Sequence, residues 1–237
     1  MLFRSIFAPF YYKAKFEGHD EVKSTLLDYI SEKYKQSPSN QPQKWSCNVH
    51  TSHGMHDEKL FSLKETYEKG IIPFFEEVRM PTVEADISEI WFNAYGKGQW
   101  QENHHHHGCN PNLYFSAVHF LKYDKSIHPA FVMNNMNRIL VSPYSIGRKT
   151  LLDYWNLNEE IDVEEGDLLI FPTFMEHQVN VQETDDLRVT VSFNIEVKQS
   201  KKIQQEKILS NSNQSQEDFH MNMIEKFIDD IPNIIGF

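Results

Sequence analysis

Apolar residues in the first part of the chain recur at helical spacing. Val22, Leu26 and Ile30 fall on one side of a helix that we expect to begin at the N-cap Asp20. The pattern continues to about Lys35, where a turn-rich stretch with two prolines follows. The sequence therefore predicts one long amphipathic helix near the N-terminus.

Two shorter helices are predicted next. One begins near Asp57 and ends at the stop signal Gly70, and Pro73 can open another that runs to about Val78. Residues 5–16, which precede the long helix, are expected to form a strand or an extended aromatic segment. The first third of the chain is thus predicted to be mainly helical.

From Thr82 onward, β-branched and aromatic residues replace the helical spacing, and turn residues separate the runs. Many short strands after a helical segment predict a mainly β protein with helices, a β-sandwich or jelly roll braced by the N-terminal helices. The predicted strands lie around Ile87–Phe92, Tyr114–Lys122, Phe131–Met133, Ile139–Val141, Leu168–Phe171 and Arg188–Val197.

The end of the chain changes character again. Residues 198–216 are rich in Lys, Gln, Ser and Asn and are expected to be a polar linker or an exposed helix. Apolar residues four apart then predict a C-terminal amphipathic helix, whose face would dock onto the core or onto a second copy to form a homodimer. The expected organisation is helical support at 1–80, a β core at 81–197, the linker at 198–216 and the last helix at 217–237.

Composition narrows the class of protein. With 237 residues, 40% of them apolar, the chain can bury one full-sized core. A formal net charge of −11 argues against a nucleic-acid binder that neutralises phosphates. Two cysteines make no disulfide framework and fit a reducing cytoplasm, while Arg4 and Pro9 interrupt the apolar N-terminus too early for a signal peptide. No apolar run reaches the length of a membrane span, so we expect a soluble cytoplasmic protein.

Four consecutive histidines are the first candidate for chemistry. Side chains alternate along a strand, so His104 and His106 would share one face and His105 and His107 the other. Two imidazoles about 6.5 Å apart on one face can bind a metal if a third ligand comes from elsewhere, and His177 is the best candidate. A solvated polyhistidine loop is the alternative, and the 105/107 pair has the same spacing as the 104/106 pair.

A second group of metal-binding side chains lies earlier in the chain. It consists of Cys47, His50, His53 and His56. No carboxylate or second cysteine completes a ligand set, so this group is a weak candidate for a second metal site.

Arg188 begins the last predicted strand and has Thr190 two residues further on, on the same face. If this strand lies next to the one that carries His177, the guanidinium and the hydroxyl would point into the same cavity. A guanidinium fork suits a carboxylate, so the pair would form a clamp for a dicarboxylate. A lone arginine in a strand is otherwise usually part of a surface ion pair.

A series of motifs in order resembles the iron(II)- and 2-oxoglutarate-dependent oxygenases. The likeness is greatest to the oxygenase group of marine bacteria and their phages, which is related to prolyl hydroxylases, and it covers roughly residues 1–197. The motifs are Trp91-Phe-Asn93, Gly98-x-x-Gln101-x-x-His104-x-His106, Phe115-Ser116-Ala-Val, Gly166-Asp-Leu-Leu-Ile-Phe-Pro-x-x-x-x-His177 and Arg188-x-Thr-x-Ser-Phe-Asn194.

The resemblance implies a fold, a reaction and cofactors. The fold would be a double-stranded β-helix, a distorted jelly roll, with Fe(II), 2-oxoglutarate and O₂ as cofactors. His104, His106 and His177 would be the metal ligands. The reaction would be hydroxylation of a C–H bond in a peptide or amino acid, with a prolyl residue as the first candidate, in the cytoplasm of a bacterium or a phage-infected host cell.

The resemblance also implies where 2-oxoglutarate binds. Arg188 would pair with its distal carboxylate, with Thr190 as an added donor. Phe120 stands where prolyl-hydroxylase relatives often carry a tyrosine that bonds the same carboxylate. Its missing hydroxyl would be replaced by Asn93, Gln101, Tyr114 or Ser116, of which Asn93 and Gln101 are preferred because they belong to the matched motif.

The sequence departs from the usual His-x-Asp…His triad, because His106 stands at the aspartate position. Three neutral imidazoles leave the ferrous centre with one more positive charge than a triad that contains a carboxylate. Protonation competes with binding, so metal affinity should fall below about pH 6.5. Glu102, on the same strand face as His104, is an alternative source of a carboxylate.

Two other functions remain open at this stage. One is a three-histidine iron dioxygenase of cupin type that uses no 2-oxoglutarate, and the other is a non-catalytic jelly roll with a structural metal. Arg188 discriminates between these functions, because only an oxygenase that binds 2-oxoglutarate requires it. The segment from Ile127 to Glu160 is expected to form loops over the mouth, and its Arg138, Tyr144, Arg148 and Trp155 would suit a peptide or an amino acid.

Overall fold

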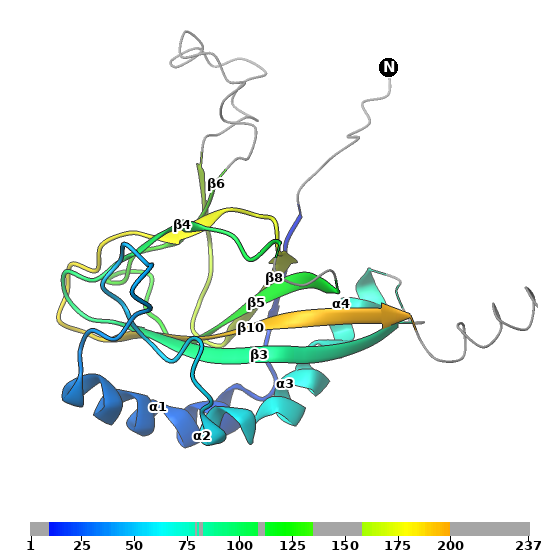
Figure 1. The fold of residues 1–237 in the computed structure, drawn as a ribbon, viewed down its shortest axis with the longest axis horizontal. Coiled ribbons are helices and arrows are strands. Elements are labelled where there is room, and N and C mark those ends of the chain that lie inside the picture. The colour runs from blue at the N-terminus through cyan, green and yellow to red at the C-terminus, as the bar shows by residue number, and fades with distance from the viewer. Residues whose placement is uncertain (1–9, 79, 81–82, 109–111, 135–157, 200–237) are drawn as a thin grey trace, which may run out of the picture. The chain divides into compact units, whose positions relative to one another are not determined.

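The computed structural model describes residues 10–78, 80, 83–108, 112–134 and 158–199 (Figure 1). The chain divides into two compact units. The first comprises Met1–Pro81 and Ala85–Val197, and the second comprises Thr82–Glu84 and Lys198–Phe237. The four helices of the described residues belong to the first unit.

Two β-sheets form the core. The larger sheet has the order β1 (Tyr12–Lys15), β8 (Asp167–Pro172), β5 (Leu113–Lys122), β10 (Arg188–Gln199), β3 (Val83–Tyr95) and β2 (His50–Thr51). The smaller has the order β4 (Gln101–His104), β9 (His177–Val179), β6 (Phe131–Asn134) and β7 (Asn158–Ile161). This is the jelly-roll arrangement, a double-stranded β-helix, and the predicted fold class is confirmed.

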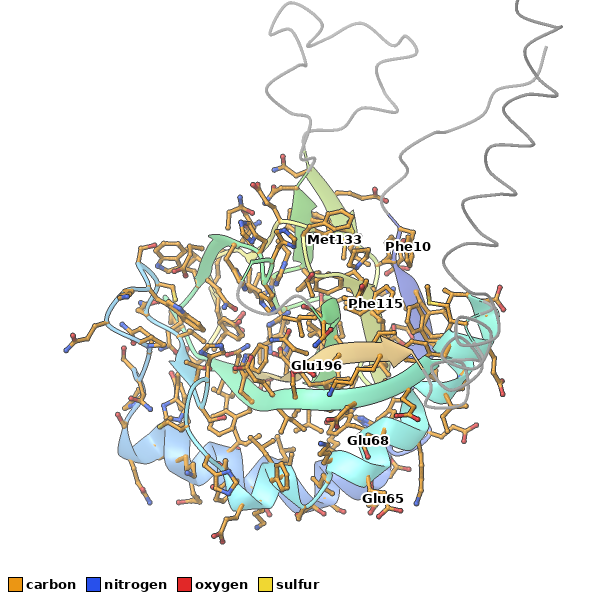
Figure 2. All side chains as sticks on the ribbon, turned by 45° about the vertical axis from the view of Figure 1, so that its right-hand side comes forward. Phe10, Glu65, Glu68, Phe115, Met133 and Glu196 are labelled. Atoms are coloured by element: carbon orange, nitrogen blue, oxygen red, sulfur yellow. The ribbon has the colours of Figure 1, made fainter. Side chains whose placement is uncertain are left out.

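Side chains from both sheets fill the interior (Figure 2). On β5 and β8, the alternate residues Val118, Phe120, Leu169 and Phe171 point inward, and they pack in one cluster with residues of the smaller sheet. The intervening residues of the same strands face the other way. The period-2 alternation of the sequence thus separates an inner core from an outer sheet face.

The outer face of the larger sheet is covered by helices (Figure 1). They are α1 (His19–Gln36), α2 (Glu58–Phe61), α3 (Lys64–Gly70) and α4 (Ile72–Glu77). The Tyr67 ring of α3 lies 4.9 Å from the Phe193 ring of β10, and Phe74 of α4 lies 4.9 Å from Phe115 of β5. None of the described helices combines the length and the apolar character that crossing a membrane requires.

Two predicted helix boundaries are wrong. The long helix begins at His19 after Gly18, so Asp20 is not its N-cap and lies in the first turn, where its charge favours the helix dipole. The helix predicted to run to Gly70 is interrupted after Phe61 and divides into α2 and α3. Asp57 does cap the first of them, since its carboxylate accepts from two backbone N–H groups.

The strands agree with the prediction except at short elements. Pairing with neighbours reveals β2, β7 and β9, which are too short to show an alternating pattern. Of the predicted segment 5–16, only Tyr12–Lys15 is a strand, and residues 1–9 lie outside the described part. Also outside it lie Ile139–Val141, the four mouth residues between 138 and 155, Cys109, most of the linker and the last helix.

A buried polar chain joins the helices to the outer face of β5. The His119 side chain is fully buried, its Nδ1 lies 2.9 Å from the Tyr67 hydroxyl, and its Nε2 lies 3.0 Å from Nδ1 of His19. Burial, and then the proximity of His19, lowers the pKa of His119 to about 3. This ring is therefore neutral in the folded protein wherever the fold persists.

The free energy of unfolding should consequently decrease as the pH is lowered. In the unfolded chain His119 takes up a proton below about pH 6.5, whereas the folded protein does not until about pH 3. The buried neutral His119 therefore does not lower the free energy of unfolding above about pH 6.5. At pH 5 this free energy should be smaller by about 2 kcal/mol. We expect urea unfolding of the metal-free protein to show this loss between pH 7.5 and pH 5, and His119→Gln to lack that part of it. His56→Gln, at an exposed histidine, is the control; equal pH dependence in both variants would contradict the assignment.

Candidate functional site

Strand pairing brings the first two histidines together. β4 and β9 are antiparallel, and His104 lies directly opposite His177 in their register, with ring centroids 4.2 Å apart. β4 ends at His104, so the strand alternation expected for residues 104–107 does not extend to His106. The His106 backbone N–H instead donates to the Thr173 carbonyl at 2.9 Å, and this contact anchors the chain after its exit from the strand.

Three imidazoles converge at this point. The ligand atoms of His104, His106 and His177 all lie within 4.8 Å of one another. His105 and His107 are exposed, and the His107 backbone N–H donates to the His105 ring. Of the two possible pairs in the histidine run, the structure brings the first, 104 and 106, to His177.

The second ring nitrogen of each converging histidine faces an acceptor. Nδ1 of His104 lies 2.8 Å from the Glu102 carbonyl, and Nδ1 of His177 lies 3.0 Å from the Met175 carbonyl. Nδ1 of His106 lies 2.8 Å from Oδ1 of Asn194. An acceptor at Nδ1 requires the proton there, so each Nε2 keeps its lone pair for a metal.

Burial keeps these rings in the neutral form. It lowers the pKa of His106 to about 4, with the nearby His104 as the second cause. Burial likewise lowers the pKa of His104, and that of His177 well below the ordinary value. Neutral imidazole is the form that binds metal ions.

A cavity of about 390 Å³ opens between the sheets beside the histidines. One wall consists of alternate residues from the inner faces of β3 and β10, which are Glu89, Trp91, Asn93, Tyr95, Arg188, Thr190, Ser192 and Asn194. Arg188 and His177 share this cavity although their strands are not neighbours. β10 lies in the larger sheet and β9 in the smaller, so the two residues line the same cavity from different sheets.

Among the described residues, Arg188 is the largest fully buried side chain, with 0% exposure. Within the part of the chain that the structure describes, its three guanidinium nitrogens have no hydrogen-bond partner. The group is surrounded by the rings of Tyr95, Phe120 and Tyr123, whose centroids lie 5.0, 5.6 and 5.5 Å from its central carbon. Burial lowers its pKa. A buried cation without a partner is costly, which indicates a site that an anionic ligand completes.

The other residues expected to bind the dicarboxylate separate into two groups. Thr190, Asn93 and Gln101 line the cavity with Arg188. The Asn93 Oδ1 atom is buried without a partner among the described residues, and the Gln101 Oε1 atom accepts from the Tyr95 hydroxyl. These three are therefore in place to contact a bound anion.

Ser116 and Tyr114 are not in that position. The Ser116 hydroxyl lies 2.9 Å from Nδ1 of His106 and 3.0 Å from Oδ1 of Asn194, and the residue does not line the cavity. It lies on the inner face of β5 beside Asn194, its register partner on β10, and its contacts are to the histidine rather than to the Arg188 end. Tyr114 is 52% exposed.

The second group of potential metal ligands does not converge. Among the described residues, the single cluster of three or more ligating side chains is that of His104, His106 and His177. The His50 ring stacks on Phe92 at 5.4 Å, and Cys47 lies in the inner core. The chain at residues 50–56 is a short strand and a turn.

Glu102 is also not a member of the metal cluster. Its Oε1 atom accepts the Ser46 backbone N–H at 3.0 Å, which holds the carboxylate toward the loop before β2. The alternative of a carboxylate ligand at this position is therefore not supported by the geometry.

Other residues that line the cavity were not among those expected to bind the metal or the dicarboxylate. Glu89 and Asn194 continue the alternation of Trp91 and Thr190, so the strand pattern could have found them. Trp45 and His53 lie in irregular segments and approach the cavity through ring contacts, the His53 ring being 5.0 Å from Trp45 and 4.9 Å from Trp91. No local pattern signals such an approach.

Comparison with known proteins agrees with this geometry. Residues 89–194 match a family model described as "Putative 2OG-Fe(II) oxygenase", and this range contains every residue of the histidine cluster and Arg188. The match over this range indicates a 2-oxoglutarate-dependent oxygenase, as the motif series predicted. No curated protein matches the sequence.

Solved structures share the fold of this oxygenase at low sequence identity. A prolyl-4-hydroxylase from Pseudomonas putida is 14% identical with a TM-score of 0.51, covering 78% of this chain and 91% of its own. The carbocyclase SnoK of nogalamycin biosynthesis is 10% identical with a TM-score of 0.55, covering 81% and 82%. The epimerase SnoN of the same biosynthesis is 10% identical with a TM-score of 0.54, covering 79% and 76%. Proteins with this fold thus carry different reactions, and the substrate has to be argued from the site.

Proposed function

We propose that this oxygenase holds iron(II) through His104, His106 and His177 and 2-oxoglutarate through Arg188, and that it hydroxylates a C–H bond of a peptide or amino acid. One observation carries the proposal. A fully buried guanidinium with no hydrogen-bond partner in the described part of the chain lines the same cavity as three imidazoles whose Nδ1 atoms face acceptors, so that Nε2 carries the lone pair. A metal ion on the imidazoles, together with a dicarboxylate that reaches from this metal to the guanidinium, would satisfy both groups.

The three histidines fit a ferrous ion. Each presents a neutral nitrogen, and the acceptors at Nδ1 hold the rings in place before the metal arrives. Three protein ligands on one side leave positions for 2-oxoglutarate and O₂, as in other non-haem iron oxygenases. When bound, iron and 2-oxoglutarate together activate O₂, with succinate and CO₂ as the co-products.

The Arg188 end of the cavity fits the distal carboxylate. The guanidinium can donate two parallel hydrogen bonds, and the Thr190 hydroxyl can add a third. Asn93 and Gln101 would contact the same ligand from the neighbouring wall. Ser116 is withdrawn from this set because its hydroxyl is engaged with His106 and Asn194.

The open side of the cavity suits an extended substrate. Trp45 and Trp91 line the cavity, and a second cavity of about 250 Å³ shares His53, Glu89 and Trp91 with the first. Flat aromatic walls accept an apolar ring such as that of proline, and the adjoining cavity has room for flanking residues. A prolyl residue in a peptide is therefore our first candidate substrate.

Turnover tests the proposal directly. Purified protein with Fe(II), 2-oxoglutarate and O₂ should form succinate, and proline-containing peptides or free amino acids that are substrates should raise this rate. The product should gain the mass of one oxygen atom. Omitting 2-oxoglutarate is the control. Oxygen incorporation without 2-oxoglutarate would indicate a three-histidine dioxygenase of the cupin type instead, and metal binding without turnover of any compound would favour a binding protein.

A further inference from the structure

The three converging histidines are held by acceptors of two different kinds. His104 and His177 face backbone carbonyls, at 2.8 and 3.0 Å. A carbonyl oxygen can only accept, so it admits only the tautomer with the proton on Nδ1. For these two rings the backbone alone leaves Nε2 without a proton.

His106 faces a side-chain amide, which can turn over. With Oδ1 of Asn194 toward the ring, at 2.8 Å, the proton must sit on Nδ1. If the amide were rotated by half a turn, its NH₂ group would face Nδ1, and the proton would have to move to Nε2. A ring protonated at Nε2 cannot bind a metal there.

The Ser116 hydroxyl does not select the tautomer of His106. Its hydroxyl lies 2.9 Å from Nδ1 of His106 and 3.0 Å from Oδ1 of Asn194. A hydroxyl both donates and accepts, so it tolerates either tautomer of the ring. The orientation of the Asn194 amide is what decides.

Glu89 holds that amide in one orientation. Its Oε2 atom accepts from Nδ2 of Asn194 at 2.9 Å. An ionised carboxylate has no proton to donate, so the rotated amide would bring Oδ1 against two carboxylate oxygens and lose the hydrogen bond. Glu89 is exposed at the mouth of the cavity, whereas Asn194 is 4% exposed.

We propose that Glu89 is a positioning residue for His106, and that through Asn194 it selects the tautomer in which Nε2 of His106 is free to bind the metal. The proposal rests on the metal site argued above. It also accounts for a departure in the sequence. Where related triads place an aspartate, this chain has a neutral histidine, and a carboxylate lies two hydrogen bonds behind it.

The tautomer can be read without any metal. In metal-free protein with ¹⁵N-labelled histidine at pH 7.5, long-range ¹H–¹⁵N spectra distinguish a proton on Nδ1 from one on Nε2, and the signals of His106 are those lost in His106→Gln. We expect wild type to carry the proton on Nδ1. Glu89→Gln should give a mixture, because a glutamine amide can pair with either orientation of Asn194.

A double variant makes the test specific. In Glu89→Gln with Asn194→Asp, the new aspartate accepts only, and the new glutamine can donate to it. The proton should therefore return to Nδ1 of His106. Iron(II) affinity should follow the tautomer, falling about tenfold or more in Glu89→Gln, within the range known for outer ligands, and recovering in the double variant. Glu76→Gln, at an exposed glutamate of α4, is the charge-matched control.

Two results would overturn the proposal. One is a Glu89→Gln protein that keeps the proton on Nδ1 and the iron affinity of wild type. The other is a double variant that stays mixed, since the effect would then not pass through Asn194. Failure of the metal site itself would look different, because the tautomers could follow the expectation while His177→Ala left iron binding unchanged.

Discussion

Replacement of His177 by alanine is expected to abolish stoichiometric iron(II) binding while the fold persists. His177 is the buried member of the cluster, and its ring centroid lies 4.2 Å from that of His104 and 5.2 Å from that of His106. Two remaining imidazoles on their own do not complete the protein's side of the site. Anaerobic titration should find one iron per chain in wild type and none held tightly in the variant, with unchanged far-UV circular dichroism.

The neighbouring histidines provide matched controls for this result. His105→Ala and His107→Ala alter exposed residues of the same run and should bind iron as wild type does. His106→Ala should lose it. If His105→Ala or His107→Ala lost iron while His106→Ala kept it, the pair assigned from the structure would be wrong.

Replacement of Arg188 by alanine should weaken 2-oxoglutarate binding by a factor on the order of 10 to 1,000. Hydrogen bonds to charged groups contribute about 1.5–3 kcal/mol, a buried carboxylate left unpaired costs more, and 1.4 kcal/mol corresponds to tenfold. Arg188→Lys should recover only part, because an ammonium group lacks the planar fork. Titration of the metal-to-ligand absorption band with 2-oxoglutarate under anaerobic conditions measures both, and iron binding should survive in each variant.

The stability of the ligand-free protein provides an independent test of the role of Arg188. Without 2-oxoglutarate the guanidinium is buried and unpaired, so Arg188→Met should unfold with a free energy equal to or above that of wild type. Adding saturating 2-oxoglutarate with iron should reverse the order, because only wild type gains the ligand's binding energy. Lys122→Met, which removes a partly exposed ion pair with Asp186 at 2.8 Å, should show no such reversal. Variants that titrate like wild type would mean that Arg188 is not the clamp.

Local patterns in the sequence determined the classes of element and the faces of the long strands. Residues 22, 26 and 30 are spaced for one side of a helix, and all three are buried. The two-residue period of β10 predicted that Arg188 and Thr190 share a face, and the same period carries Ser192 and Asn194 into the cavity. Such periods follow from backbone geometry within one segment, which is why they need no knowledge of neighbours.

The order of motifs along the chain also identified the family, because it preserves the residue types that the chemistry needs. The family model confirms that recognition over residues 89–194. The individual roles of Arg188, Thr190, Asn93 and Gln101 stay proposals until the titrations are done. The predictions for residues 198–237 lie almost entirely outside the described part of the chain.

Contacts between segments distant in the sequence were decided only by the tertiary structure. The strand ends at His104, so His106 reaches the cluster through a loop anchored on Thr173 rather than by strand alternation. Arg188 and His177 line one cavity from two different sheets.

The hydrogen-bond partners of the histidine rings were likewise decided only by the tertiary structure. Ser116 serves His106 instead of the dicarboxylate, and the chain from Glu89 through Asn194 to His106 joins residues 88 to 105 positions apart. The sequence contains these side chains, but which donor meets which acceptor depends on strand register and sheet packing. Those are properties of the whole fold, and no window of neighbouring residues contains them.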